Sequence, residues 1–460
     1  MNIIQERMEK FIQDFFGLDM LELGLEQWLE KGRQGFAQFQ LECAQLELEM
    51  LDETLFETPS IRPGWTVVRK APRTLVTHYG TLEFTRRYYH HTQTGARAHL
   101  VDELTDIIRY GRVEAGLATD LCRLASECSY RRSTEIACDG AVSRQTVMQT
   151  LRKLQIPEVA TDNVKSDVPE IHIQADEDHV TIQTKPSRRK KQKGMVKLAV
   201  LHDPIEQQGN RRYIPSKYSM PGRQESNERY WERILDKIYE RYGDLGTRPV
   251  YIHGDGAPWI KTGVEIIPNS RFVLDRYHLE KALHAACNRY KAPSHWRTLR
   301  EALKKLDLPK LVETLMTCGR EGICSHETAR TTIYYLVNNW EGIEITKDPN
   351  ERPGASCAEG LVGHLLSDRL SRRPLSWSRE GVTQMAALRA FISNGGAVSS
   401  NMLRTQPKNT NDLPAKKKIN LTRYRYCPMP SDALKATKRG TPLYRLCKAI
   451  TNGGRGGLIS

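Results

Sequence analysis

Two aspartates stand where apolar runs end, and their type and placement suit chemistry that depends on a metal ion. The first run, Val250 to Ile252, leads into Asp255 between two glycines, and the second, Arg271 to Leu274, stops at Asp275. If both runs are parallel strands joined by a short helix, both carboxylates lie at the carboxyl edge of one sheet, where open α/β sheets bind ligands. The glycines keep bulk away from Asp255 and let backbone or a ligand approach closely. A charge buried there is costly unless the protein uses it.

A third acidic group lies earlier in the chain. The segment IHIQADEDHVTIQ alternates as a strand does and carries Asp176, Glu177 and Asp178 at its centre. Strand alternation puts Asp176 and Asp178 on one face and Glu177 on the other, so either aspartate is a candidate metal ligand. The basic loop that follows contains Arg188, Arg189, Lys190 and Lys191. A basic loop beside carboxylates suits an enzyme acting on nucleic acid, because phosphate is held while the acids hold metal; a solvated charge run is the alternative.

The elements around these acids follow the order of a known fold. Three strands, a helix, the strand before Asp255, a short helix and the strand before Asp275 give the order β-β-β-α-β-α-β, with acids on the first and fourth strands. The third strand is expected in RRYIPSKYSM and the first helix between Glu225 and Tyr242. The layout is that of a ribonuclease-H-like α/β fold.

Length and charge set limits on the whole chain. At 460 residues the chain is too long for one ordinary core, so about two or three domains are expected. A net charge of +14 and a pI near 9.2 favour a polyanionic partner. No apolar run approaches the roughly 18 to 20 residues of a membrane helix, and the N-terminus has no cleavage pattern, so a cytoplasmic protein without a membrane partner is expected. The ten cysteines form no CxxC pair, which favours reduced thiols over a zinc site.

The N-terminal part is expected to be mainly helical. Apolar residues recur at helical spacing through residues 1–57, which predicts two helices that pack or self-associate. From Trp65 to Tyr89 the period changes to two around Gly80, which predicts a hairpin. Its Arg86 and Arg87 are interpreted either as contacts to a phosphate backbone or as part of a solvated strand face.

A helix-turn-helix is predicted between residues 117 and 154. One helix breaks at Asp139-Gly140 and the next restarts at Ser143, a good N-cap residue. In such a layout the second helix enters a DNA groove, which would expose Arg144, Gln145 and Gln149 for base or phosphate contacts. A plain helical hairpin has the same pattern, so both interpretations stay open.

The segments ADEDH, HGDGAPWIK and FVLDRYHLEKAL resemble those of the ISLre-type bacterial insertion-sequence transposases, distant relatives of the Mutator-like group. The resemblance extends over most of the chain, including RTLVTHYG and ECSYRRSTE. It implies a DNA transposase with an Asp-Asp-Glu triad on a ribonuclease-H-like core. By matching positions, it assigns Asp176 and Asp255 to the triad, and Asp275 with His278 to the Asp-x-x-His signature that follows.

The same resemblance guides the choice of the third carboxylate. Glu359 lies near the start of a predicted helix and ahead of the arginine-rich end with Arg372 and Arg373. It is our candidate for the last triad member, with Glu351 and Asp368 as fallbacks. An ordinary first-turn glutamate, stabilised by the helix dipole, is the alternative. Three such carboxylates suit two Mg²⁺ ions, or Mn²⁺, about 3.5 to 4 Å apart, which activate the attacking oxygen and stabilise the leaving oxygen of a phosphoryl displacement.

Asp275 and His278 have a second interpretation. Together with His284 and Cys287 they have the ligand types of a zinc site, but no cysteine pair lies near them. We therefore expect the pair to position the DNA end.

The C-terminal stretch is the most basic part of the chain. Residues 401–460 contain thirteen Lys and Arg, among them Lys416, Lys417 and Lys418, against two Asp. Such single-sign clustering predicts an arm that follows a phosphate backbone.

The predicted architecture is an α/β ribonuclease-H-like catalytic core with an all-helical insertion, preceded by a mainly helical DNA-binding region. Its parts are a helical region at 1–60, a hairpin plus helix-turn-helix domain at 61–160, the core at 168–278 and 351–400, the insertion at 279–350 and the basic arm at 401–460. The partner would be double-stranded DNA, bound by a homodimer or larger assembly close to the bacterial nucleoid. A DNA-binding protein without catalysis and a nuclease that cuts without joining remain alternatives.

Overall fold

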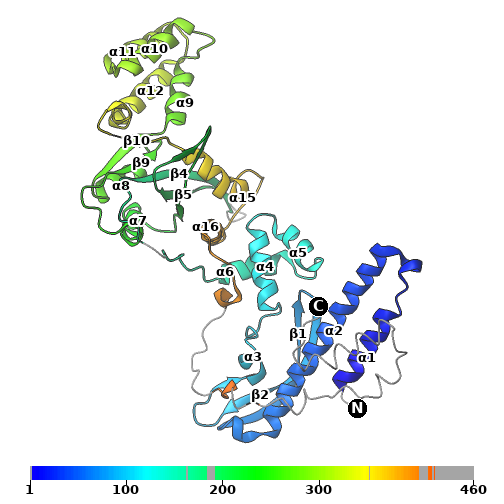
Figure 1. The fold of residues 1–460 in the computed structure, drawn as a ribbon. Coiled ribbons are helices and arrows are strands. Elements are labelled where there is room, and N and C mark those ends of the chain that lie inside the picture. Colours follow the sequence, from blue (N-terminus) through cyan, green and yellow to red (C-terminus); the bar gives the residue numbers. More distant parts are fainter. Residues whose placement is uncertain are drawn as a thin grey trace. The chain divides into compact units, whose positions relative to one another are not determined.

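The structure is a computed structural model that describes residues 3–161, 164–183, 192–351, 353–403, 413–416 and 419. The chain divides into two compact units, one of Met1–Thr150 with Ser399–Ser460 and one of Leu151–Val398 (Figure 1). The basic loop residues Arg188, Arg189, Lys190 and Lys191, and Lys417, Lys418 and most of the predicted arm, lie outside the described residues.

The first unit begins with two helices, α1 (Ile3–Phe16) and α2 (Met20–Glu57), as predicted. Asp19 caps α2 by accepting a hydrogen bond from the Leu21 backbone at 2.8 Å. Aromatic rings join the two helices, and Phe11 of α1 lies 4.7 Å from Phe39 of α2 between ring centroids. This pair of helices is therefore held by packing rather than by polar contacts alone.

The predicted hairpin follows, with β1 (Trp65–Thr77) antiparallel to β2 (Gly80–His91) and a short third strand, β3 (Arg97–Ala98). Both interpretations of its arginines were wrong. Arg86 pairs with Asp102 at 2.6 Å, and Arg87 pairs with Asp52 of α2 at 2.6 Å, and all four side chains are buried. The arginines hold the hairpin to neighbouring helices because buried charges need close partners.

A set of short helices completes the described part of this unit. The turn between two of them places Asp139 at φ 47° and Gly140 at φ 79°, both left-handed, and Ser143 accepts a hydrogen bond from the Thr146 backbone at 3.2 Å. The predicted turn and N-cap are thus present. The short helices are η1 (Pro59–Ile61), α3 (Leu100–Leu104), α4 (Ala115–Ala125), α5 (Tyr130–Cys138), α6 (Arg144–Lys153), which runs into the second unit, and η4 (Ser400–Leu403).

The second unit is built on a five-stranded mixed sheet in the order β10-β9-β4-β5-β8. Strands β4, β9 and β10 are parallel, and β5 runs antiparallel to both β4 and β8. The predicted third strand, residues 211–220, is divided, because its first part pairs in a separate small hairpin and only its second part joins the sheet. The strands are β4 (Ile171–Ile182), β5 (Gln192–His202), β6 (Glu206–Gln208), β7 (Arg211–Tyr213), β8 (Lys217–Pro221), β9 (Val250–Gly254) and β10 (Ser270–Leu274).

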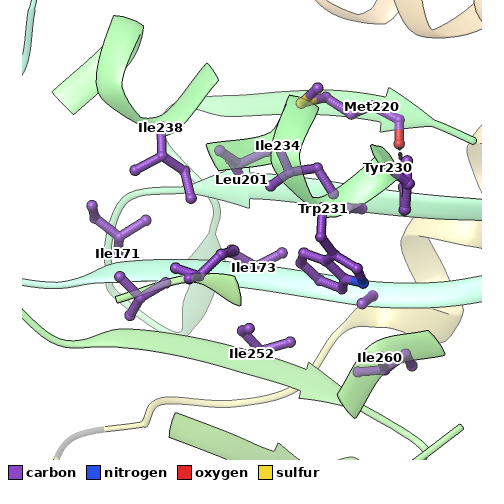
Figure 2. Packing of buried hydrophobic residues seen from close by; sticks show 14 of the residues in the cluster. Ile171, Ile173, Leu201, Met220, Tyr230, Trp231, Ile234, Ile238, Ile252 and Ile260 are labelled. Carbon is purple, nitrogen blue, oxygen red and sulfur yellow. Dashed lines mark hydrogen bonds between the residues drawn. The ribbon is translucent and has the colours of Figure 1, made fainter. Parts of the chain in front are cut away.

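One face of this sheet is apolar and is covered by α7 (Asn227–Tyr242) and α8 (Pro258–Ile266). Figure 2 shows Trp231 and Ile234 of α7 directed toward Ile173 of β4, all three fully buried. The Trp231 indole nitrogen donates to the Trp259 carbonyl at 2.5 Å, so its one polar atom is satisfied. This face carries the main hydrophobic core of the unit.

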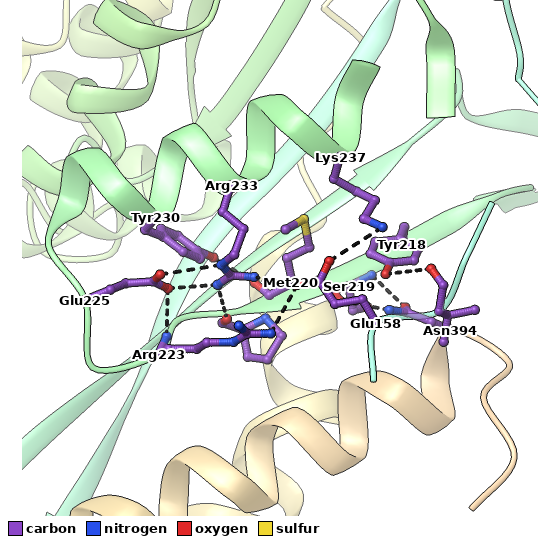
Figure 3. A network of polar contacts seen from close by, with 12 residues as sticks. Glu158, Tyr218, Ser219, Met220, Arg223, Glu225, Tyr230, Arg233, Lys237 and Asn394 are labelled. Atoms are coloured by element: carbon purple, nitrogen blue, oxygen red, sulfur yellow. Dashed lines mark hydrogen bonds and ion pairs between the residues drawn. The ribbon is translucent and has the colours of Figure 1, made fainter. Parts of the chain in front are cut away.

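The other face is polar and is covered by the helical segments after residue 357. His172, Gln174 and Asp176 of β4 are buried on this face. Asn394 is the C-cap residue of α16. Its side chain accepts from the Ser219 backbone N–H at 2.7 Å and donates to the Ser219 carbonyl at 2.9 Å, which ties α16 to β8 (Figure 3). The covering segments are α14 (Ala358–Val362), a π-helix (Gly363–Ser367), α15 (Asp368–Leu370) and α16 (Arg379–Ser393).

A helical block interrupts the chain between β10 and α14 and lies on the β10 side of the sheet (Figure 1). It has a hydrophobic core of its own, with Leu283, Leu299 and Leu311 fully buried. Its elements are α9 (Arg276–Ala286), α10 (Pro293–Lys305), α11 (Leu308–Arg320), α12 (His326–Asn338), α13 (Glu341–Glu344) and η2 (Ile345–Lys347).

The described residues form a mixed α/β fold with a helical N-terminal region and a mixed sheet. Within them, no helix has the length and apolar character needed to cross a membrane. The eight cysteines that the structure describes are free thiols.

Candidate functional site

Three aspartates follow corresponding positions on the three parallel strands. On β4 and β9, Gln174 pairs with His253, so Asp176 and Asp255 each come two residues later. On β9 and β10, Gly254 pairs with Leu274, and the Asp275 backbone N–H donates to the Gly254 carbonyl at 2.8 Å. Because neighbouring strands lie about 4.8 Å apart, the three aspartates lie side by side across the sheet, just beyond the ends of β9 and β10 and in the middle of β4.

The glycines beside Asp255 let protein atoms approach. A Cβ on Gly254 would lie 2.9 Å from the Ala175 carbonyl oxygen and 2.6 Å from Ile260, so β9 and β4 stay close up to the aspartates. A Cβ on Gly256, which has φ +89°, would lie 2.2 Å from the Asn339 side-chain oxygen. Of the two roles predicted for these glycines, the structure thus demonstrates the close approach of protein groups.

Asp176 is buried, and its surroundings disfavour its ionised form. Burial, and then the nearby carboxylates of Asp255 and Glu177, raise the pKa of Asp176 to about 7, although the Glu177 backbone N–H and His278 act in the other direction. That N–H donates to the Asp176 carboxylate at 2.8 Å. A carboxylate held in this way takes up a proton or a cation readily at neutral pH.

Asp275 and His278 form a pair on the first turn of α9. Asp275 caps the helix by accepting from the Tyr277 backbone at 2.6 Å, and its second oxygen accepts from the Ser356 hydroxyl at 2.7 Å. Burial opposes ionisation of Asp275, but the contacts with His278, Ser356 and the helix start lower its pKa below the ordinary value. In return, Asp275, followed by the fields of Asp176 and Asp255, raises the pKa of His278. The acids of the site therefore favour the protonated form of His278.

The other acids of β4 have separate partners. Asp178 lies on the same face as Asp176, and one of its oxygens accepts from the hydroxyls of Ser371 at 2.7 Å and Ser367 at 3.1 Å. Glu177 faces the opposite side and accepts from the Trp259 indole at 2.5 Å. The alternation predicted for this strand is thus correct, and Asp178 is bound to the segment that covers the polar face.

Glu359 lies exposed in the first turn of α14, and α14 packs against β4. It comes three residues after Ser356, whose hydroxyl contacts Asp275. At no more than about 3.6 Å per residue, the Cα of Glu359 lies within about 11 Å of the Cα of Ser356. This places Glu359 near the segment that contacts Asp275, and its approach to Asp176 and Asp255 stays a prediction.

The two fallback acids have other partners. Glu351 accepts from the Tyr251 hydroxyl at 2.7 Å and from Arg271 at 3.2 Å, beside the second residues of β9 and β10 and so away from their carboxyl ends. Asp368 pairs with Arg372, one turn later. These contacts disfavour both as partners of the aspartates.

A groove opens on the helical block beside the aspartates. It has a volume of about 560 Å³, and Asp255 and His278 form part of its wall. The Tyr335 hydroxyl donates to the Asp255 backbone carbonyl at 2.9 Å, which fixes α12 to the end of β9. The groove is otherwise lined by Lys281, Ala282, Ala285, Ser325, Glu327, Thr328, Thr331, Thr332 and Tyr335.

The donor atoms at this edge are of the kind that Mg²⁺ prefers. Carboxylate oxygens suit a hard divalent cation, and the second oxygen of Asp178 is buried without a hydrogen-bond partner. In the described part of the chain, however, no three His, Cys, Asp or Glu side chains are gathered as a preformed metal site. The zinc alternative through His284 and Cys287 gains no support there either, since the His284 ring packs edge-on against Trp296.

Apart from the buried Arg86 and Arg87, the residues predicted to contact DNA are exposed wherever the structure describes them. Arg144, Gln145 and Gln149 lie on the outer side of α6, as predicted. Arg372, Arg373 and Lys416 are exposed as well, with Arg372 paired to Asp368 and Lys416 3.8 Å from Asp106. Their contact with DNA stays a prediction.

A polar layer beneath the aspartates was not predicted from the sequence. Gln174 and the three buried histidines His172, His202 and His253 lie on the same face of the sheet as Asp176. The alternation that placed Asp176 and Asp178 also points Gln174 to this face, so Gln174 was open to prediction. Ser356 had no such signal, since it lies in a segment without regular structure.

Comparison with known proteins gives a family. The pattern described as "Uncharacterised protein family (UPF0236)" matches residues 17–406. Three similar proteins come from Caldanaerobacter subterraneus subsp. tengcongensis. UPF0236 protein TTE2489 is 36% identical over 360 residues, 77% of this chain and 76% of the relative. UPF0236 protein TTE0402 is 36% identical over 354 residues, 76% and 70% of the two chains. A third, whose name combines eleven locus designations, is 37% identical over 360 residues, 77% and 75%.

Among solved structures, the Drosophila P element transposase strand transfer complex is similar at 12% identity, over 72% of this chain and 92% of that chain. Its TM-score of 0.23 is too low to carry an argument. The family match and the relatives cover most of the sequence, and the chain belongs to the uncharacterised protein family UPF0236.

Proposed function

We propose that this protein is a DNA transposase of a bacterial insertion sequence, with Asp176, Asp255 and Glu359 as its metal-binding catalytic triad. The observation that carries the proposal is that Asp176, Asp255 and Asp275 lie at corresponding positions across three neighbouring parallel strands, in the middle of β4 and just beyond the ends of β9 and β10. Acids from distant parts of a chain converge in this way where a site uses their charge, because unused carboxylates at a buried edge are costly.

The order of the strands supports a ribonuclease-H-like interpretation of the sheet. The first strand of the sheet, β4, lies at its centre, the next two, β5 and β8, extend it on one side in alternating direction, and β9 and β10 extend it in parallel on the other. We interpret the helical block after β10 as the predicted insertion.

The residues have distinct proposed roles. Asp176 and Asp255 would hold two Mg²⁺ ions, with Mn²⁺ as a substitute, and Glu359 would complete the ligand set from α14. When bound, the ions supply activation of the attacking oxygen and stabilisation of the leaving oxygen. His278, whose protonated form the nearby acids favour, would hold a DNA phosphate, with Asp275 orienting its ring.

The names of the relatives support a mobile element. One relative carries eleven locus designations of a single organism, and another carries four. A protein-coding segment that recurs at many loci of one genome is what an element that copies itself leaves behind. A housekeeping nuclease or a repressor has no need of such multiplicity, so this pattern favours transposition over the two alternatives.

The DNA contacts are proposed on two surfaces. The exposed residues of α6 would read or grip an element end, and Arg372 and Arg373 would hold phosphate near the triad. Two element ends must be processed together, so a homodimer or larger assembly is proposed on mechanistic grounds.

The test is a cleavage and joining assay with the full-length protein. The DNA that flanks the gene on both sides is placed on a supercoiled plasmid, and products are separated with and without Mg²⁺. Joined products support the proposal. Nicks without joining would replace it with a nuclease, and a gel shift without any cleavage would replace it with a DNA-binding protein.

Matched variants test the assignment of the triad. Asp176→Asn, Asp255→Asn and Glu359→Gln each abolish cleavage in the proposed scheme, while Glu351→Gln and Asp368→Asn keep it. Retained gel shifts show that the inactive variants still bind DNA. Activity in Glu359→Gln together with loss in Asp368→Asn would overturn the choice of the third acid.

A further inference from the structure

A buried glutamine fastens the segment that enters α14. Gln174 is 1% exposed, and its side-chain oxygen accepts from the Cys357 backbone N–H at 3.0 Å. Its side-chain nitrogen contacts His202 at 3.1 Å and lies 3.4 Å from the Ala355 carbonyl. Both ends of the amide therefore engage the backbone of residues 355–357 as a neighbouring strand would.

Ser356, in the middle of that segment, bridges the glutamine and the site. Its hydroxyl lies 2.7 Å from the Asp275 carboxylate and 3.4 Å from the Gln174 side-chain oxygen. A hydroxyl has one proton, so it donates to the charged and closer acceptor, Asp275. Asp275 in turn is held by the first turn of α9.

The contact between Ser356 and Asp275 closes a long excursion of the chain. The two residues are 81 positions apart, and the whole helical block lies between them. Asp275 is the last residue before that block, and Ser356 lies two residues before α14. The hydrogen bond therefore fixes where the chain re-enters the sheet and, through Cys357, where α14 begins.

We propose that Gln174 and Ser356 are positioning residues that hold the start of α14, and thereby Glu359, beside Asp176 and Asp255. This inference rests on the proposed function. A buried glutamine that served packing alone would be replaceable by leucine at little loss of metal binding. A positioning glutamine is not, because ligand-orienting partners outside the immediate shell typically change metal affinity or activity by about 10- to 100-fold.

The test uses four variants of the full chain: Ser356→Ala, Ser356→Thr, Gln174→Leu and the matched control Thr317→Val. Ser356→Ala removes only the bridging hydroxyl, and Ser356→Thr restores it. Thr317 of α11 lines neither the groove nor the bridge, and its hydroxyl donates to the Glu313 carbonyl of the same helix at 2.9 Å. Mn²⁺ binding to the protein alone is measured by electron paramagnetic resonance, and Mg²⁺ dependence is measured in the cleavage assay.

Ser356→Ala and Gln174→Leu are expected to weaken Mn²⁺ binding and to raise the half-saturating Mg²⁺ concentration about 10-fold or more, with DNA gel shifts unchanged. Ser356→Thr and Thr317→Val should stay within about 2-fold of the wild type. Wild-type Mn²⁺ binding and Mg²⁺ dependence in a folded Ser356→Ala would overturn the inference, whatever Gln174→Leu does to folding.

The outcome also separates this inference from the proposed function. If the wild-type protein binds Mn²⁺ through Asp176 and Asp255 but never cuts DNA, transposition is excluded, and the Mn²⁺ affinities of the Ser356 variants still decide the positioning role. If the wild-type protein does not bind Mn²⁺ at all, both proposals are overturned.

Discussion

The two faces of the five-stranded sheet differ although the same strand supplies both. On β4, Ile171, Ile173 and Ala175 point into the apolar core with α7 and α8. The residues between them, His172 and Gln174, lie in the polar layer that leads to Asp176. Alternate residues of this twelve-residue strand therefore serve the hydrophobic core on one face and the candidate site on the other.

The difference between the faces shows how each is held together. The apolar face depends on close packing, so its loss is felt as stability. The polar face depends on hydrogen bonds from Gln174, Ser356 and Asn394, each of which fixes a covering segment to the sheet. Changes on the apolar face should thus mainly lower the free energy of unfolding. Changes on the polar face should lower activity at the acids, and should lower stability where a covering segment is held or at acidic pH.

The largest effect is expected at the acids of the polar face. Asp255→Asn should lower DNA cleavage by about 10³-fold or more, equivalent to at least about 4 kcal/mol of transition-state stabilisation. The free energy of unfolding should be unchanged or slightly higher, because removal of one carboxylate relieves the repulsion that raises the pKa of Asp176. Cleavage kinetics and urea unfolding measure the two quantities.

Glu351→Gln is the matched control for that prediction. Glu351 is paired with Tyr251 and Arg271 away from the aspartates, so cleavage should be retained. Cleavage by Asp255→Asn at the wild-type rate would show that the polar edge is not the reaction centre.

The next effect is expected on the apolar face. Trp231→Ala removes the largest fully buried side chain among the described residues and should lower the free energy of unfolding of this unit by about 3 to 5 kcal/mol. Trp231→Phe keeps most of the packing and should cost less. Urea unfolding monitored by circular dichroism measures both, and a Trp231→Ala protein as stable as the wild type would contradict the assignment of this face as the main core.

The sequence allowed much of this arrangement to be predicted, for local reasons. Alternation on β4 separated Asp176 from Glu177, and apolar runs that end on Asp255 and Asp275 indicated strand ends. Ser143 was recognisable as an N-cap because capping needs only residues close in sequence.

What the sequence did not reveal depends on partners far along the chain. Arg87 is buried and pairs with Asp52, which lies 35 positions away in the chain. No local sequence pattern distinguishes such an arginine from a solvated one. Ser356 gains its role from Asp275 only after the helical block has folded. Pro215 lies between the two parts of the predicted third strand, and a proline at that position disfavours one continuous strand.

The stability contributed by the histidines of the polar face is expected to depend on pH. Burial lowers the pKa of both His172 and His202 to about 4, against 6.5 in the unfolded chain. As the pH falls below about 6.5 the unfolded state takes up protons first, so stability is fully present above that value and is lost progressively toward pH 4. Each histidine contributes about 3 kcal/mol to this loss.

Urea unfolding between pH 8 and pH 4 measures the slope. His202→Gln should reduce it, whereas His179→Gln should not, since His179 lies exposed on the same strand. Equal slopes in the wild type and His202→Gln would contradict the buried, neutral state of the histidine layer.

The smallest effect is expected where the cover of the polar face meets the edge of the sheet. The Asn394 amide both accepts from and donates to the Ser219 backbone, so it acts as an additional hydrogen-bonding strand beside β8 (Figure 3). Asn394→Ala leaves these buried backbone groups without partners and should lower the free energy of unfolding by about 1 to 3 kcal/mol. Asn394→Asp keeps the acceptor and should lose less. Because α16 would remain packed on β5 and β8, cleavage at low temperature should stay near the wild-type rate, whereas a large loss of activity without a loss of stability would mean that this contact serves the site itself.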